Sequence, residues 1–177
     1  MTAGRKINSQ SQEWGTPPKY VNAIKEFFGG EIALDPCSNN YSIVNAKVEY
    51  KLPQDGLTEK WNYKNVYVNP PYGRNKNNKT TIKDWIRKCL ETHEQYSSEI
   101  IALIPVATNT RHWKQYIFDK ADCICFLYDT RLKFLIDGKD EGKGAPMACA
   151  LVYWGKNRYK FCEIFDGKYG SVVTLSS

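Results

Sequence analysis

The sequence has no apolar stretch near the roughly 18 to 20 residues that a membrane-spanning helix requires. Its first residues, MTAGRKINSQSQEW, lack the apolar segment of a secretory signal. We therefore expect a cytoplasmic protein that makes no contact with a membrane. The 177 residues, 42% of them hydrophobic, are enough for one compact domain with its own core, and too few for a multidomain assembly.

Histidine is scarce, which limits the possible metal chemistry. His93 and His112 are the only histidines that could accompany the Cys123-x-Cys125 pair, so no metal site is predicted. The six cysteines could form three disulfides, but each lies in an apolar segment and the chain carries no export signal. Buried free thiols are therefore the preferred interpretation. The cysteines are Cys37, Cys89, Cys123, Cys125, Cys149 and Cys162.

A net charge of +6 and 14% aromatic residues suit a polyanionic partner without requiring one. Composition alone therefore leaves an enzyme and a nucleic-acid-binding module equally open. The polar, Ser/Gln-rich start of the chain has no apolar period and is typical of a mobile arm. The expected organisation is an arm over residues 1–12, a single domain over residues 13–170 and a tail over residues 171–177.

Apolar spacing and turn residues predict alternating helices and strands. The first helix is expected to have Thr16 as its N-cap and Pro17 at its first position, and to end at Gly29-Gly30. A capping-box pattern, Thr81 with Asp84, predicts the start of a second helix. Strands are predicted over residues 31–36, 65–69, 100–105, 122–128, 131–136 and 147–154, and helices over residues 16–28, 81–96 and 110–120.

The order of these elements predicts the fold class. Strands that alternate with helices up to residue 120 imply a mostly parallel sheet with helices on both faces. The cluster of strands that follows implies an antiparallel hairpin at one edge of that sheet. The predicted class is therefore α/β.

The most informative residues are Asn69-Pro70-Pro71-Tyr72, at the carboxyl end of a predicted strand, where open α/β sheets bind ligands. Each residue before a proline is held extended, and neither proline can donate a backbone N–H. A fixed pair of acceptors remains, the Asn69 amide oxygen and the Pro70 carbonyl, with the Tyr72 ring beside it. Such a cluster suits a planar, conjugated amino group, whose two N–H bonds it would accept.

This tetrapeptide and the motifs around it resemble the compact phage-type DNA N-6-adenine methyltransferases. The resemblance covers most of residues 13–155. It is carried by residues 13–18, 34–38, 55–57 and 68–73, and further by residues 107–113 and 131–134. It implies a Rossmann-like, three-layer methyltransferase fold with S-adenosylmethionine as cofactor. The implied reaction moves a methyl group to N6 of adenine in double-stranded DNA by direct in-line displacement, after the base has been flipped out.

The resemblance also assigns roles to individual residues. It implies a catalytic group of Asn69, Pro70, Pro71 and Tyr72 that holds the target adenine. It implies a cofactor site made of Trp14, Thr16, Pro17, Asp35, Pro36, Asp55 and Asn69. The chain departs from many methyltransferases because residues 35–40 contain no G-x-G turn, although the small phage-type family is expected to have this form.

Several of these residues have a simpler interpretation. Asp35 could cap the end of its strand, and Asp55-Gly56 is a common turn dipeptide. Trp14 could be a packing residue, while Thr16 and Pro17 are explained by the start of a helix. The cofactor roles of Thr16 and Pro17 therefore depend on the resemblance alone.

Positive charge is concentrated just after the tetrapeptide. Residues 74–88 carry six basic side chains and one acid, Asp84, where a phosphate backbone would pass a catalytic site. The alternative interpretation is that these basic side chains only form a solvated helix face. The residues expected to bind DNA are Arg74, Lys76, Lys79 and Arg131.

Alternatives to a DNA methyltransferase remain open. The same tetrapeptide would serve a methyltransferase acting on RNA adenine or on a protein glutamine amide. A non-catalytic nucleic-acid-binding module would leave the tetrapeptide without a role. Saturable binding of S-adenosylmethionine separates an enzyme from such a module.

Overall fold

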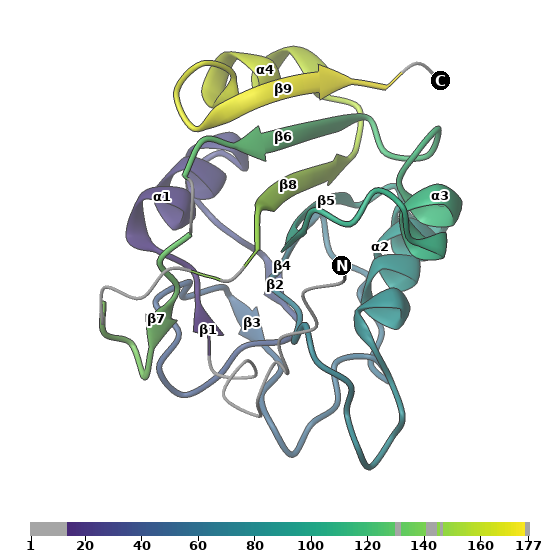
Figure 1. Cartoon of the computed structure of the whole chain (residues 1–177). Helices are drawn as coiled ribbons and strands as arrows, with labels where there is room; N and C mark the ends of the chain where they lie inside the picture. The colour runs from purple at the N-terminus through teal and green to yellow at the C-terminus, as the bar shows by residue number, and fades with distance from the viewer. Residues whose placement is uncertain (1–13, 130–131, 141–144, 146, 176–177) are drawn as a thin grey trace.

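Seven strands form the central sheet of the computed structural model, which describes residues 14–129, 132–140, 145 and 147–175 (Figure 1). In spatial order the strands are β3 (Val48–Glu49), β2 (Leu34–Asp35), β4 (Asn65–Val68), β5 (Glu99–Pro105), β8 (Cys149–Trp154), β6 (Cys123–Leu127) and β9 (Gly170–Thr174). The first four strands in this order run parallel to one another. β8 is antiparallel to β5 and to β6, and β9 is antiparallel to β6.

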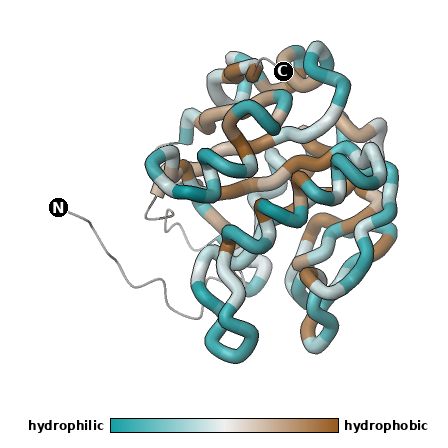
Figure 2. The backbone as a smooth tube through the Cα atoms, turned by 90° about the vertical axis from the view of Figure 1, so that its right-hand side faces the viewer, coloured by the Kyte–Doolittle hydropathy of each residue, from teal (hydrophilic) through white to brown (hydrophobic). Residues whose placement is uncertain are grey.

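Helices cover both faces of this sheet. Side chains of β5 alternate between two cores: Ile101 and Leu103 pack with α1 and α4, whereas Ile100 and Ile104 pack with α2 and α3. Figure 2 shows hydrophobic, brown segments through the middle of the molecule and a hydrophilic, teal loop at its lower end. The predicted mixed α/β class is therefore confirmed. The helices are α1 (Pro18–Phe27), α2 (Ile82–Tyr96), α3 (Arg111–Tyr116) and α4 (Arg158–Phe165).

The starts of the first two long helices follow different rules. For α2 the predicted capping box is present: the Thr81 N–H donates to the Asp84 carboxylate at 2.9 Å. For α1 the predicted cap is wrong, because the helix begins at Pro18 and Pro17 is the N-cap residue. The Pro17 carbonyl accepts the first helical hydrogen bonds, and the Thr16 hydroxyl instead contacts Tyr67, 51 positions away in the sequence.

The late strands differ from the predicted edge hairpin. β8 lies inside the sheet, between β5 and β6, so it pairs on both sides. In the described part of the strand predicted over 131–136, which is residues 132–136, only β7 (Leu135–Ile136) forms, and it pairs with β1 (Trp14–Gly15) in a separate small antiparallel sheet. The alternating apolar pattern that suggested a longer strand arises because Leu132 and Phe134 enter the core from irregular backbone.

The end of the chain also differs from expectation. Residues 171–174, expected to be part of a tail, belong to β9, which pairs along the whole of β6. Arg158 at the start of α4 donates to the Asp122 carboxylate and to the Leu175 carbonyl, which holds this end against the sheet. The arm expected over residues 1–12 lies outside the described residues.

Within the described parts of the chain, no helix is both long and apolar enough to cross a membrane. All six cysteines are free thiols. Four of them are buried as expected, whereas Cys37 and Cys162 are partly exposed.

Candidate active site

The loops that follow β2, β3 and β4 enclose a cavity of about 610 Å³. It therefore lies at the carboxyl ends of parallel strands, where sheets of this type bind ligands, and its volume is in the usual range for a small-molecule site. Its lining comprises residues 36–41 after β2, residues 50–57 after β3, and Pro71, Gly73, Asn75, Asn77, Asn78, Thr80 and Trp85 after β4.

A close backbone approach shapes one wall of this cavity. A Cβ atom at Gly56 would lie 1.8 Å from the Pro36 carbonyl oxygen, so only glycine fits there. Next to it, Asp55 accepts the Leu57 N–H with one carboxylate oxygen and the Asn78 side-chain amide with the other. Asp55 thus shapes its own turn and ties the loop of residues 73–80 to the cavity wall.

Two buried oxygens near the cavity have no hydrogen-bond partner within the described chain: Glu49 Oε1 at the end of β3 and Ser38 Oγ after β2. Buried acceptors without donors are costly, so they mark places where a ligand could supply hydrogen bonds. Sequence reasoning missed Glu49. The two-residue strand that carries it gives too short a pattern to recognise.

Asp35 lies opposite Glu49 in the register of β2 and β3. Its carboxylate accepts the Cys37 N–H at 3.1 Å, and its side chain is buried. Burial, with a further contribution from the negative charge of Glu49, raises the pKa of the Asp35 carboxyl to about 7. Asp35 is not among the residues that line the cavity, whereas its neighbour Pro36 is.

Asn69 follows β4 directly, and its side-chain amide is held from the amino-terminal segment. Its Nδ2 donates to the Trp14 carbonyl at 2.8 Å and to the Thr16 hydroxyl at 3.3 Å. The only contact to its Oδ1 among the described residues is from the Tyr72 hydroxyl, at 3.5 Å, the limit of hydrogen-bond length. Both amide donors are therefore used inside the protein, and the oxygen is the atom left to accept from a ligand.

An aromatic group lies beside Asn69. Trp14 stacks on Phe134 with ring centroids 5.1 Å apart, and Tyr72 meets both rings edge-on. Tyr72 is buried, and its hydroxyl donates to the Leu103 carbonyl at 3.2 Å. Sequence reasoning singled out Trp14 and Tyr72 but gave Phe134 no role, although the motif at residues 131–134 contains it.

The basic segment of residues 74–88 is divided in the structure between the loop after Tyr72 and helix α2. Arg74, Lys76 and Lys79 are exposed on the loop after Tyr72. Arg131, the fourth residue expected to bind DNA, lies outside the described residues.

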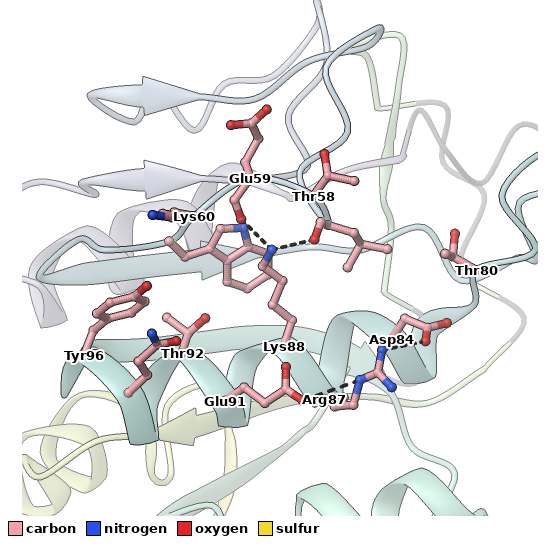
Figure 3. A pocket seen from close by; sticks show the side chains of 13 residues that line it. Thr58, Glu59, Lys60, Thr80, Asp84, Arg87, Lys88, Glu91, Thr92 and Tyr96 are labelled. Atoms are coloured by element: carbon pink, nitrogen blue, oxygen red, sulfur yellow. Dashed lines mark hydrogen bonds and ion pairs between the residues drawn. The ribbon is translucent and has the colours of Figure 1, made fainter.

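Arg87 and Lys88 of α2 line a second, smaller cavity of about 440 Å³ (Figure 3). There Arg87 pairs with Asp84 and Glu91, and Lys88 donates to the carbonyls of Leu57 and Glu59 across the cavity floor. Burial lowers the pKa of Lys88, whose ammonium also lies over the Trp61 ring. The side chains of Arg87 and Lys88 therefore both interact with groups of the protein itself.

A scan against protein families matches residues 4–173 to DNA N-6-adenine-methyltransferase (Dam). The chain belongs to this family. Dam proteins methylate adenine in DNA and normally use S-adenosylmethionine, so DNA is the substrate that the family implies. A search of curated proteins gave no match to the sequence.

The cavity fits the cofactor of the Dam family. S-adenosylmethionine carries hydroxyl and amino donors and a positive charge. Ser38, which lines the cavity, has a free oxygen that can accept from such groups, and Glu49, which precedes the lining residue Tyr50, has another. Of the seven residues that sequence reasoning assigned to the cofactor, Pro36 and Asp55 line the cavity. Trp14, Thr16 and Asn69 form the neighbouring hydrogen-bonded cluster, and Pro17 caps α1.

Proposed function

We propose that this Dam-family protein methylates the exocyclic N6 of adenine in double-stranded DNA, with Asn69, Pro70, Pro71 and Tyr72 as its catalytic group. The orientation of the Asn69 amide carries this proposal. Its two donors are bonded to Trp14 and Thr16, which leaves Oδ1 to accept from an amino group.

The chemistry needs acceptors rather than a strong base. The lone pair of the adenine amino group is delocalised into the ring, so the nitrogen is a poor nucleophile. Asn69 Oδ1 and the Pro70 carbonyl would accept its two N–H bonds, drawing them out of plane, and would stabilise the positive charge that develops on nitrogen. S-adenosylmethionine, when bound, supplies an activated methyl group. The amino nitrogen would bond to that methyl in line as the methyl–sulfur bond breaks, which releases the neutral thioether S-adenosylhomocysteine. One of the N–H bonds held by Asn69 Oδ1 and the Pro70 carbonyl would then lose its acidified proton to solvent.

The base must leave the duplex to reach Asn69. Flipping costs a few kcal/mol, and contact with aromatic side chains offsets part of that cost. Trp14, Tyr72 and Phe134 form an aromatic cluster beside Asn69, in which Trp14 is partly exposed, and we propose that the flipped adenine packs against this cluster.

The DNA backbone would pass the loop that follows the catalytic group. Arg74, Lys76 and Lys79 are exposed there and are available to phosphates. We retain Arg131 as a fourth proposed contact on the strength of the sequence resemblance.

The cofactor would lie in the 610 Å³ cavity with Pro36 and Asp55 at its wall. Glu49 and Ser38 join the proposed site because each has a buried oxygen free to accept from hydroxyl or amino groups. Trp14, Pro17, Asp35 and Asn69 complete the site that the resemblance proposes, and Thr16 joins it through its hydrogen bond to Asn69.

An RNA adenine or a glutamine amide would present similar nitrogens, and a non-catalytic module would need none of this geometry. The Dam family match favours DNA over these alternatives.

Incubating the protein with DNA and methyl-labelled S-adenosylmethionine, followed by digestion to nucleosides, tests the proposal. We expect labelled N6-methyladenine. Label found only in RNA or in protein would refute the assignment of DNA as the substrate.

The variant Asn69→Ala tests the catalytic group. It should lower the methylation rate by at least about 100-fold, because it removes an acceptor used in the transition state. Cofactor affinity, measured by calorimetry, should stay close to that of the native protein. Asn22→Ala, an exposed position on α1, is the matched control. Full activity of Asn69→Ala would contradict the mechanism.

A further inference from the structure

A chain of buried hydrogen bonds continues behind Asn69 into the sheet. The Thr16 hydroxyl, which accepts from Asn69 Nδ2, also lies 2.6 Å from the hydroxyl of Tyr67. Thr16 is 2% exposed and Tyr67 is completely buried, so water does not compete for these groups. Tyr67 lies in β4, two residues before Asn69, which follows the end of that strand directly.

The chemistry of these partners fixes which way the Asn69 amide points. A backbone carbonyl can only accept, so the atom facing Trp14 O must be the nitrogen. The second amide N–H is directed at Thr16 Oγ1. A flipped amide would place Oδ1 against the Trp14 carbonyl, acceptor against acceptor, and would present a donor to the substrate.

Thr16 is buried and is not among the residues that line the 610 Å³ cavity. The resemblance implies a place for Thr16 in the cofactor site, and its hydroxyl is hydrogen-bonded to Asn69 and Tyr67. Its place in the structure is behind the catalytic amide.

We propose that Thr16 and Tyr67 are positioning residues, which lock the Asn69 amide with Oδ1 toward the substrate amino group. This rests on the proposed function of Asn69. Tyr67 fixes the Thr16 hydroxyl, and Thr16 with the Trp14 carbonyl takes up both amide donors. The site thereby starts each reaction with its acceptor already aligned, and no reorientation is needed as charge develops.

Four variants test the role of the hydroxyls. Thr16→Val removes the Thr16 hydroxyl at constant shape, Thr16→Ser keeps it, and Tyr67→Phe removes only the phenolic oxygen. Tyr153→Phe is the matched control, since Tyr153 is also fully buried and its hydroxyl is also hydrogen-bonded within the protein, to Glu99 and Asn157.

We expect Thr16→Val to lower the single-turnover methylation rate about tenfold, and Tyr67→Phe about threefold, consistent with the loss of one hydrogen bond each. The Kd for S-adenosylmethionine and the KM for DNA should change by less than about twofold, since the lost interaction acts on the transition state. Thr16→Ser should restore most of the rate, and Tyr153→Phe should react as the native protein does. An unchanged rate in Thr16→Val, or a loss that appears in cofactor affinity instead, would overturn the proposal.

A second measurement does not depend on activity. The NMR signals of the Asn69 side-chain amide, identified by their absence in Asn69→Ala, report proton exchange with water. Exchange should be faster in Thr16→Val than in Thr16→Ser or Tyr153→Phe, and equal rates would overturn the proposed lock. If the native protein fails to methylate DNA, the proposed function fails, and this measurement still decides whether Thr16 holds the amide.

Discussion

Asp35 shows how the surroundings of a single residue set its protonation. Its carboxyl is buried beside β3, and both burial and the charge of Glu49 disfavour the ionised form. The pKa is therefore about 7 in the folded protein, against an ordinary value of 3.8. The folded state consequently binds more protons than the unfolded state between these two values.

This difference predicts how stability depends on pH. The contribution of Asp35 is fully present below about pH 4 and is lost as the pH rises toward 7, on the order of 4 kcal/mol in the free energy of unfolding. Asp35→Asn cannot ionise and keeps an acceptor for the Cys37 N–H. Urea unfolding at pH 5 and pH 8 should therefore show a larger decrease for the native protein than for this variant. Equal decreases would show that Asp35 ionises normally in the folded state.

At the scale of elements, α2 and the loop before it divide one basic run between two tasks. Lys76 and Lys79 point into solvent, whereas Lys88, on α2, holds the loop of residues 57–59 by its carbonyls. The number of basic residues in the segment therefore overstates how many of them are available to bind a polyanion.

Two variants separate these tasks. Lys76→Ala combined with Lys79→Ala should weaken DNA binding and reduce its dependence on salt, by close to one unit of slope for each phosphate that the variant no longer neutralises. Lys88→Met should leave DNA affinity near that of the native protein and lower the free energy of unfolding by about 1–3 kcal/mol, since it removes charged donors from two carbonyls. Fluorescence anisotropy at several salt concentrations and urea unfolding measure the two effects. The opposite pattern would reassign Lys88 to the DNA interface.

Local sequence rules predicted what depends on neighbours in the chain. Asn69-Pro70 at a strand end, the Thr81–Asp84 cap and the turn at Asp55 all follow from residues within a few positions of each other. The roles of Thr16 and Lys88 could not be predicted, because their partners lie 51 and 31 positions away. No local pattern encodes such pairings, which arise only when the sheet brings its loops together.

At the scale of the whole molecule, β9 protects the outer side of β6. It pairs with β6 over five positions, and the hydrogen bonds of Arg158 hold its end. Without β9, the apolar strand β6 would be an exposed edge, which favours association between copies.

Shortening the chain tests this role. Deletion of residues 170–177 should lower the melting temperature and produce aggregates in size-exclusion chromatography, because β6 loses its pairing partner. Deletion of residues 176–177 alone is the control and should behave as the native protein does. A monomer of unchanged melting temperature after the longer deletion would show that β9 is dispensable.

The position of β8 inside the sheet has a consequence for how the protein is made. Ribosomal synthesis delivers β5 and then β6 before β8, yet β8 is the strand that separates them. Until Trp154 has left the ribosome, the edge of β5 that pairs with β8 has no partner, and the nascent chain exposes that edge. Strand β1, residues 14 and 15, likewise cannot pair until β7 has been synthesised. The site around Asn69 is therefore completed late in translation, although Asn69 itself lies in the first half of the chain.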